Sequence, residues 1–249
     1  MNKIPLVMAL LINIAAVAQT TTPTKTIHHR EQAWAAYLNQ TRLSNKWGLW
    51  AEVHYRMTDN FVDRPFSLLI RPGVTYFIKD NLRATAGYAL VEHYPAKGLH
   101  TTRTEHRIWQ QIAWNQKYPR LATTQWLRLE QRYLEKIAND ARVGGYVHSW
   151  RARYNFSFFV PLKGKDMEPK VPYVMLQNEL FLSFGKNVVY NTFDQNRLFL
   201  GMGYQFSPQL NAQLGYMNVF QQTAAGNDYF SSNAVRLYVF HTVDLRSKG

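Results

Sequence analysis

Cysteine is absent from this chain of 249 residues, and acidic residues are scarce, with 16 Asp and Glu against 29 Lys and Arg. The lack of cysteine excludes a disulfide framework and thiol chemistry. Beyond residue 18 the chain also has no continuous apolar run of the roughly 20 residues that a membrane-spanning helix needs. No linker, low-complexity block or shift of composition divides the sequence, so we expect one domain.

The first 18 residues have the features of a secretory signal peptide. Lys3 supplies a positive charge, Ile4–Ala18 is a nearly uncharged apolar stretch, and the small residues at 16–18 suit cleavage before Gln19. A proline and an asparagine interrupt the apolar stretch, which is also too short for a membrane anchor. The sequence therefore predicts an exported protein.

Export changes what the net charge of +13 implies. A basic intracellular protein would suggest nucleic acid, but for an exported chain we expect no such partner. Two alternatives remain: positive residues line an interior, or positive loops contact anionic lipid headgroups. The mean hydropathy of −0.34 and the aromatic content of 14% are typical of a barrel in which only alternate residues face lipid.

The stretch 196–220 has the clearest periodicity. The apolar residues that share one face of its first half are Leu198, Leu200, Met202, Tyr204 and Phe206. On the opposite face only Phe199 is apolar, and after a Ser-Pro turn the alternation resumes. Alternation over about ten residues with aromatic residues near the strand ends is what a strand tilted across a bilayer requires. The pattern predicts an all-β fold, a transmembrane antiparallel up-and-down β-barrel.

Alternation of period two predicts eleven strands in the mature chain. They cover residues 31–42, 46–57, 65–78, 81–93, 104–115, 122–135, 145–160, 171–185, 195–207, 209–221 and 232–245. Short joints at 44–45, 79–81 and 207–208 contrast with longer joints near 58–64, 94–103, 136–144, 186–194 and 222–231. Short periplasmic turns and longer external loops are the pattern of outer-membrane barrels.

An odd count conflicts with bacterial barrels, whose strand number is even. A weak strand within Thr20–Arg30 would make twelve, and a barrel without segment 31–42 would have ten. We predict about twelve strands, with ten as the alternative, because a closed wall leaves no exposed edge. The expected organisation is a signal peptide at 1–18, a flexible segment or weak first strand at 19–30, and an outer-membrane barrel at 31–249.

Strand parity assigns the charged residues to the lumen, because a charge that faces lipid costs about 2–4 kcal/mol at the midplane. The predicted lumen-lining residues are Glu52, His54, Arg56, Arg83, Glu105, Arg107, Arg128, Glu130, Arg132, Arg151, Arg153, Glu179, Arg197 and Arg236. Arg71 has the same parity. Inward Gly201, Gly203 and Gly215 are expected to make room for bulky arginines from other strands.

Three segments resemble a known family: Glu105–Gln111, Trp126–Arg132 and Phe193–Tyr204. With Leu214–Tyr216 and Arg236–Tyr238 they are similar to the bacterial family called domain of unknown function 2490, over nearly the whole mature chain. This resemblance implies an outer-membrane barrel and no particular chemistry.

We predict no catalytic, cofactor-binding or metal site. Nucleophilic catalysis on a strand needs a hydroxyl and a base on one face, but no His-x-Ser occurs, and the adjacent His148 and Ser149 fall on opposite faces. Asp59, Asp63 and Asp194 lie in or beside predicted external loops, where cations could bind. Isolated loop acids are more often simply solvated.

The arginines leave the function open. They could form a positive channel that selects anions, or they could pair with carboxylates and seal the lumen. We expect a structural barrel or a small-solute channel, and the alternatives are a lipid-modifying hydrolase or a surface-binding barrel that acts through its external loops. Expected partners are outer-membrane lipids, lipopolysaccharide and small anionic solutes. The sequence predicts neither a cofactor nor an oligomer.

Overall fold

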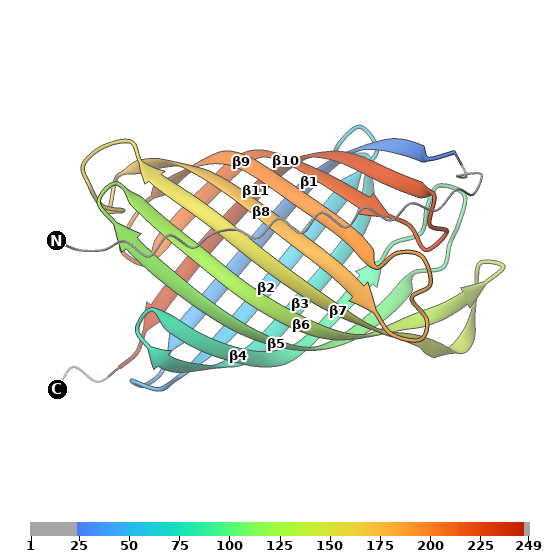
Figure 1. Cartoon of the computed structure of the whole chain (residues 1–249), viewed down its shortest axis with the longest axis horizontal. Helices are drawn as coiled ribbons and strands as arrows, with labels where there is room; N and C mark the ends of the chain where they lie inside the picture. The colour runs from blue at the N-terminus through green and yellow to red at the C-terminus, as the bar shows by residue number, and fades with distance from the viewer. Residues whose placement is uncertain (1–23, 247–249) are drawn as a thin grey trace, which may run out of the picture.

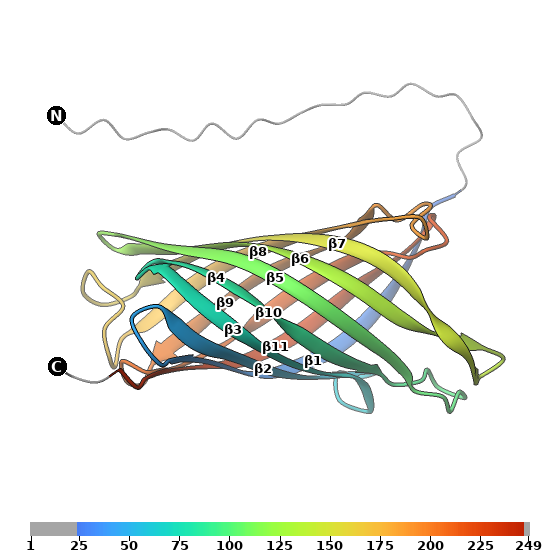
Figure 2. The same cartoon turned by 90° about the horizontal axis from the view of Figure 1, so that it is seen from below.

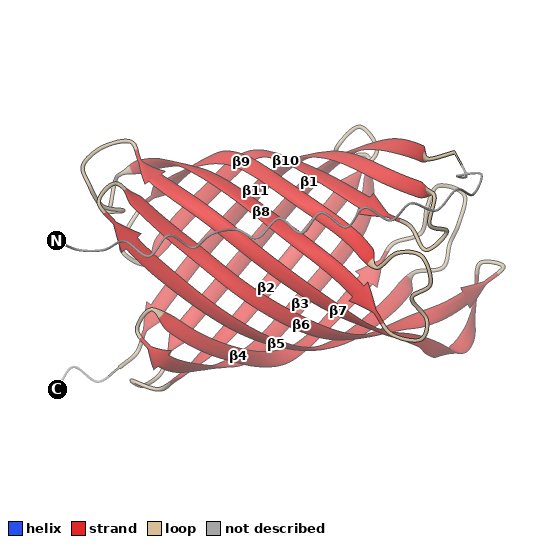
Figure 3. Ribbon diagram, in the orientation of Figure 1, coloured by secondary structure: helices blue, strands red, loops and turns tan. Residues whose placement is uncertain are grey.

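The computed structural model describes residues 24–246, which form a closed barrel of eleven strands (Figure 1, Figure 3). The predicted signal peptide at 1–18 lies outside the described residues. Within 24–246 there is no helix long and apolar enough to cross a membrane. The fold is thus all-β, as the alternating sequence predicts.

The strands follow one another along the chain with short connections. They are β1 (Thr26–Arg42), β2 (Trp47–Thr58), β3 (Arg64–Lys79), β4 (Leu82–His93), β5 (Arg103–Tyr118), β6 (Leu121–Ala138), β7 (Ala141–Pro161), β8 (Pro172–Phe184), β9 (Phe193–Gln205), β10 (Leu210–Gln222) and β11 (Asp228–Asp244). Each pairs in antiparallel register with its neighbours in sequence, and a parallel pair of β1 with β11 closes the wall.

The parallel seam accounts for the odd number of strands. In an up-and-down wall of eleven strands, the first and last run in the same direction. Their register extends from Thr26 opposite Asp228 to Arg42 opposite Asp244, over the whole length of β1. Parallel pairing satisfies the backbone groups of both strands and leaves no edge.

The observed strand number lies between the predicted twelve and ten. Segment 31–42 is a full wall strand, and it begins earlier than expected, at Thr26. Residues 26–30 therefore extend β1 instead of forming a separate strand. No twelfth strand is needed because β11 already occupies the free side of β1.

The two ends of the barrel differ. We call the end where β11 finishes the short-turn end, and its connections are 43–46, 80–81, 119–120, 162–171 and 206–209. The opposite, long-loop end has connections 59–63, 94–102, 139–140, 185–192 and 223–227. β1 starts at the long-loop end, far from the C-terminus (Figure 2).

One predicted loop is wrong. The joint expected near 136–144 is a two-residue turn, Asn139-Asp140, whose φ angles of 49° and 56° are those that a type I′ hairpin requires. Because the turn is so tight, β6 and β7 reach 18 and 21 residues and project past their neighbours at the long-loop end (Figure 1). Sequence periodicity alone did not detect this extension.

The outward face of the wall is apolar. Leu198, Leu200 and Met202 are 48–56% exposed, whereas Phe199 between them is 1% exposed. Aromatic pairs lie on the outward face towards both ends, such as Trp47 with Tyr76, whose ring centroids are 5.1 Å apart. The wall therefore alternates as the parity of the sequence predicts.

The inward glycines of β9 and β10 accommodate aromatic rings and not arginines, which corrects the prediction. The ring of Phe199 covers Gly201 and Gly215, and a Cβ atom on Gly215 would lie 2.9 Å from its Cζ atom. The ring of Tyr173 covers Gly203 in the same way. Among the described residues, the one arginine close to this group is Arg236, whose guanidinium group lies over the Phe199 ring and not against the glycines.

Candidate functional site: an arginine-lined lumen

The barrel encloses a cavity of about 750 Å³. All eleven strands contribute to its lining. The lining extends from Arg42 and Asp244 at the short-turn end to Arg30 and His93 at the long-loop end. The cavity thus follows the lumen along the length of the barrel.

Each predicted lumen-lining residue points into the barrel, because each occupies an inward position of its strand. Those that line the cavity are His54, Glu52, Arg56, Arg83, Arg107, Arg128, Arg132, Arg151, Arg153, Glu179, Arg197 and Arg236. The remaining two, Glu105 and Glu130, are 0% exposed and lie beneath arginine side chains. Arg71 also lines the cavity.

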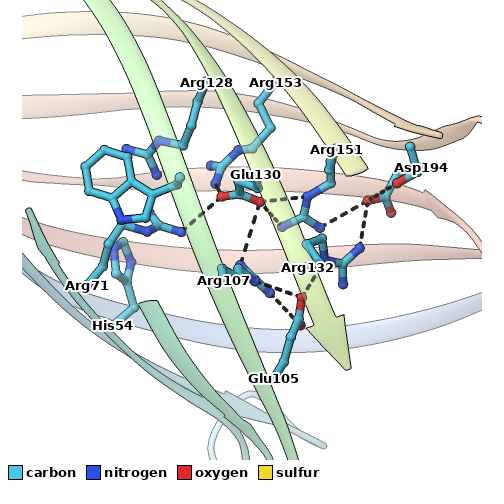
Figure 4. A network of polar contacts seen from close by, with 12 residues as sticks. His54, Arg71, Glu105, Arg107, Arg128, Glu130, Arg132, Arg151, Arg153 and Asp194 are labelled. Atoms are coloured by element: carbon cyan, nitrogen blue, oxygen red, sulfur yellow. Dashed lines mark hydrogen bonds and ion pairs between the residues drawn. The ribbon is translucent and has the colours of Figure 1, made fainter. Parts of the chain in front are cut away.

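Most of these residues form one ion-pair network (Figure 4). Its carboxylates are Glu52, Glu105, Glu130, Glu179 and Asp194, and its guanidinium groups belong to Arg71, Arg107, Arg128, Arg132, Arg151, Arg153 and, at its edge, Arg197. The network crosses the lumen between strands distant in sequence, since Arg128 donates to Glu52, 76 residues away, at 3.2 Å.

Glu130 is the centre of the network. Its carboxylate accepts hydrogen bonds from Arg151 Nη2 at 2.6 Å and Arg153 Nη1 at 2.7 Å, and Arg71 Nη2 lies 3.4 Å away. Arginines of two other strands, β3 and β7, thus meet at this one buried group of β6 (Figure 4). Charge-assisted bonds to guanidinium groups are the kind that can hold a carboxylate ionised out of bulk water.

Glu52 and Glu105 are likewise surrounded by cationic or hydrogen-bonding side chains. Glu52 accepts from Arg71 Nη1 at 2.7 Å and from His54 Nε2 at the same distance. Glu105 binds Arg107 in bidentate fashion, with Nε and Nη2 at 2.9 and 2.8 Å. Bidentate pairs fix the guanidinium plane and so restrict the shape of the lumen.

Asp194 belongs to the network and not to a loop, which corrects the prediction. The register between β8 and β9 shifts beside it, so that Asp194 and Gln195 are both buried. Its carboxylate accepts from Arg151 Nη1 at 3.1 Å and Ser183 Oγ at 3.2 Å. A β-bulge of this kind inverts strand parity, so period-two alternation could not assign its direction.

Three of the predicted lumen-lining arginines stay outside the network: Arg56, Arg83 and Arg236. No carboxylate of residues 24–246 lies within 4.0 Å of them. Arg236 donates to the side-chain oxygens of Gln177 at 2.7 Å and Gln213 at 3.3 Å, which are neutral acceptors. The Nε atoms of all three are buried without a hydrogen-bond partner among these residues.

Aromatic rings flank two of these arginines. The guanidinium carbon of Arg56 lies 3.8 Å from the Trp34 ring centroid, and that of Arg236 lies 3.4 Å from the Phe199 ring. Tyr238 lies 4.5 Å from Arg236. Sequence reasoning missed these rings as site residues, although Phe199 was visible as the apolar residue on an otherwise polar face.

The described residues show no arrangement of the kind that hydrolases or metal sites use. None of their histidine rings is hydrogen-bonded to a Ser or Thr hydroxyl, and no group of three or more His, Asp or Glu could hold a metal ion. The loop acid Asp59 accepts from Arg64 Nε at 2.8 Å, and this hydrogen bond lowers the pKa of Asp59. Asp63 accepts from Asn60.

The chain matches the family described as protein of unknown function (DUF2490) over residues 31–230. It belongs to this family. No curated protein sequence matches the chain. A solved structure described as a NanC porin in a rhombohedral crystal form is similar at 12% identity, with a TM-score of 0.49, and the match covers 84% of this chain and 98% of the porin chain.

Proposed function

We propose that this protein is a β-barrel of the bacterial outer membrane that conducts small anions through an arginine-rich lumen. The outward face supports the location, since its exposed Leu, Val, Ile and aromatic side chains would be costly in water and suit a bilayer. The signal peptide expected from the sequence supports the same compartment. Outer-membrane lipids and lipopolysaccharide are the proposed partners of this outer face.

The charge of the lumen carries the proposal. The ends of the cavity carry Arg30, Arg42 and Lys117 against Asp80 and Asp244, and between these ends ten inward arginines stand against five carboxylates, an excess of five positive charges. The ten inward arginines are Arg56, Arg71, Arg83, Arg107, Arg128, Arg132, Arg151, Arg153, Arg197 and Arg236. Rings of Arg or Lys select anions in a pore.

Planar-bilayer recordings test this proposal. The full mature chain in a KCl gradient should carry a current whose reversal potential reports preference for chloride. The double variant Arg56→Gln, Arg236→Gln should lower this preference, and Lys97→Gln, in an exposed loop, should not. A complete lack of current, or a preference for potassium, would refute an anion channel.

A sealed structural barrel is the second candidate. The observation that favours it is the network itself, because Glu130 and its arginines cross the lumen and are almost wholly buried. A folded barrel that carries no current would support this candidate. Heat-dependent mobility in detergent gels would establish that the barrel is folded in such an experiment.

We further propose that the protein is not an enzyme. His148 packs against the outward Tyr133 ring, with centroids 4.8 Å apart, while Ser149 occupies an inward position opposite Arg132. A base and a nucleophile on opposite faces of a strand cannot exchange a proton. Hydrolysis of phospholipid or lipid A that is lost in Ser149→Ala or His148→Ala would contradict this proposal.

A further inference from the structure

We infer that the lumen contains a binding site for an organic anion with an apolar body, such as an aryl carboxylate, formed by side chains of β1, β2, β9 and β11. The site consists of Arg56 and Arg236 with the rings of Trp34, Phe199 and Tyr238. This inference rests on the part of the proposed function that lets solutes enter the lumen. It specifies the class of ligand and the position of its binding site.

The two arginines are adjacent to one aromatic residue. In the register of the closing seam, Trp34 pairs with Arg56 on one side and with Arg236 on the other. A side chain of β9, Arg197, also reaches the Trp34 ring, with its guanidinium carbon 4.9 Å from the centroid. Positive charge therefore converges on one aromatic surface.

Arg56 and Arg236 lack a carboxylate partner among the described residues, and Arg197 has only a distant one. Arg56 donates no hydrogen bond to a described residue, and Arg236 donates only to glutamine amides. Arg197 lies 3.8 Å from its one carboxylate neighbour, Glu179, too far for a hydrogen bond. A guanidinium group can donate two parallel bonds to a carboxylate, and Arg56 retains the capacity that Arg107 has already used on Glu105.

The wall around the arginines is apolar, which a lumen for inorganic ions does not require. A contiguous cluster spans β1 and β8–β11 and comprises Trp34, Ala36, Leu38, Tyr173, Met175, Phe199, Met217, Val219, Ala234 and Tyr238. Most of its larger side chains line the cavity. Interiors of water-filled barrels are normally polar, whereas binding sites for organic molecules combine apolar walls with a few placed polar groups.

The rings are held in place by the backbone. Phe199 lies against Gly201 and Gly215, where a Cβ atom on either residue would overlap it, and Arg236 covers its other side. Tyr238 accepts or donates a hydrogen bond with His54 Nδ1 at 3.3 Å. Side chains that are fixed before a ligand arrives reduce the entropic cost of binding.

The site predicts selectivity by ligand body as well as by charge. A small carboxylate such as acetate gains the guanidinium bonds but buries no apolar area. A neutral aryl amide buries apolar area but does not gain the charge-assisted guanidinium bonds. An aryl carboxylate gains both contributions. We therefore expect 2-naphthoate to bind at least tenfold more tightly than either acetate or 2-naphthamide.

The experiment is a calorimetric titration of the full mature chain in lipid nanodiscs with these three probes. Arg56→Gln with Arg236→Gln should weaken 2-naphthoate binding at least tenfold. Phe199→Leu should weaken 2-naphthoate binding by a larger factor than acetate binding, because only 2-naphthoate packs against the ring. Arg83→Gln is the matched control, because Arg83 is also inward and unpaired but lies on β4, outside the apolar cluster.

Equal affinity for 2-naphthoate and acetate would overturn the inference, and so would an Arg83→Gln variant that is weakened as much as the double variant. A heat-dependent gel shift verifies the folding of each variant, and the comparison of probes in the unmodified chain needs no variant. An anion-selective current with no preference for 2-naphthoate would refute the site and leave the channel standing. Selective 2-naphthoate binding without current would refute the channel and support the site.

Discussion

The two sides of the lumen place arginines in opposite surroundings. On the paired side, centred on β5–β7 with members from β2, β3, β8 and β9, guanidinium groups alternate with buried carboxylates in the ion-pair network. On the apolar side, formed by β1 and β8–β11, Arg236 lies among rings and methionines with only amide partners. The same residue type is thus a crosslink on one side and an uncompensated charge on the other.

The inward position of an arginine on its strand therefore does not by itself define the role of that arginine. Arg151 and Arg236 are both inward, central and less than 6% exposed. Arg151 has two carboxylate partners, whereas Arg236 has none. Stability should therefore depend on the paired side, and ligand recognition should depend on the apolar side.

The largest expected effect comes from the centre of the paired side. Glu130→Gln keeps the side-chain shape but leaves Arg151 and Arg153 with a buried charge that lacks its main partner. We expect the variant to lose about 3–5 kcal/mol of stability, the usual result of breaking a buried pair. The measurement is the denaturant dependence of the heat-dependent gel shift in detergent.

Glu31→Gln is the control for this change, because Glu31 is exposed on β1 and has no ion pair with a described residue. Its stability should equal that of the unmodified chain. If Glu130→Gln were as stable as this control, the ion-pair network would not be what stabilises the barrel.

A smaller loss should follow from Gly215→Ala on the apolar side. The added methyl group would meet the backbone of β9 and the Phe199 ring. Overpacking of this kind typically costs about 1–3 kcal/mol. The same variant should also weaken 2-naphthoate binding, because the ring must shift. Unchanged stability together with unchanged binding would contradict a fixed position for Phe199.

Removal of an unpaired arginine should not lower the stability of the barrel. Arg56→Met deletes a charge that has no protein acceptor and keeps an unbranched side chain beside Trp34. We expect stability to stay equal or to rise by about 1 kcal/mol, since apolar replacement of buried charge is often neutral or stabilising. Arg151→Met, measured alongside, should be strongly destabilising. Similar losses in both would erase the proposed contrast between paired and unpaired arginines.

The smallest effect concerns an exposed carboxylate at the long-loop end. Asp140 accepts hydrogen bonds from the backbone N–H groups of Thr101 and His100, both at 2.8 Å, and these bonds lower the pKa of Asp140. A lowered pKa means that this contact stabilises the fold above the unfolded pKa of about 3.9 and is lost as the pH falls through the folded pKa.

Hydrogen exchange at the Thr101 and His100 amides measures this contact. Protection relative to the intrinsic exchange rate should fall between pH 5 and pH 2 in the unmodified chain. In Asp140→Asn the protection should be low and independent of pH in this range. Persistent protection in that variant would show that the carboxylate does not hold the loop. Asp140 could then no longer serve as the exposed carboxylate with which the buried ones are compared.

Much of the wall could be predicted from local alternation. The inward direction of Arg128, Glu130 and Arg132 follows from their spacing of two residues on an extended strand. Local rules fail where the backbone departs from regular pairing. The bulge beside Asp194 and the tight turn at Asn139 each changed an assignment that periodicity had made.

The sequence by itself determined which side chains face the interior and which face outward, because adjacent residues of a strand point to opposite faces and charge is costly on an apolar face. Only the tertiary structure decided that the wall closes through a parallel seam of β1 with β11. It also decided that Glu130 is surrounded by arginines while Arg56 has no carboxylate partner. These roles depend on distances across the closed lumen between strands far apart in sequence, and local alternation carries no information about them.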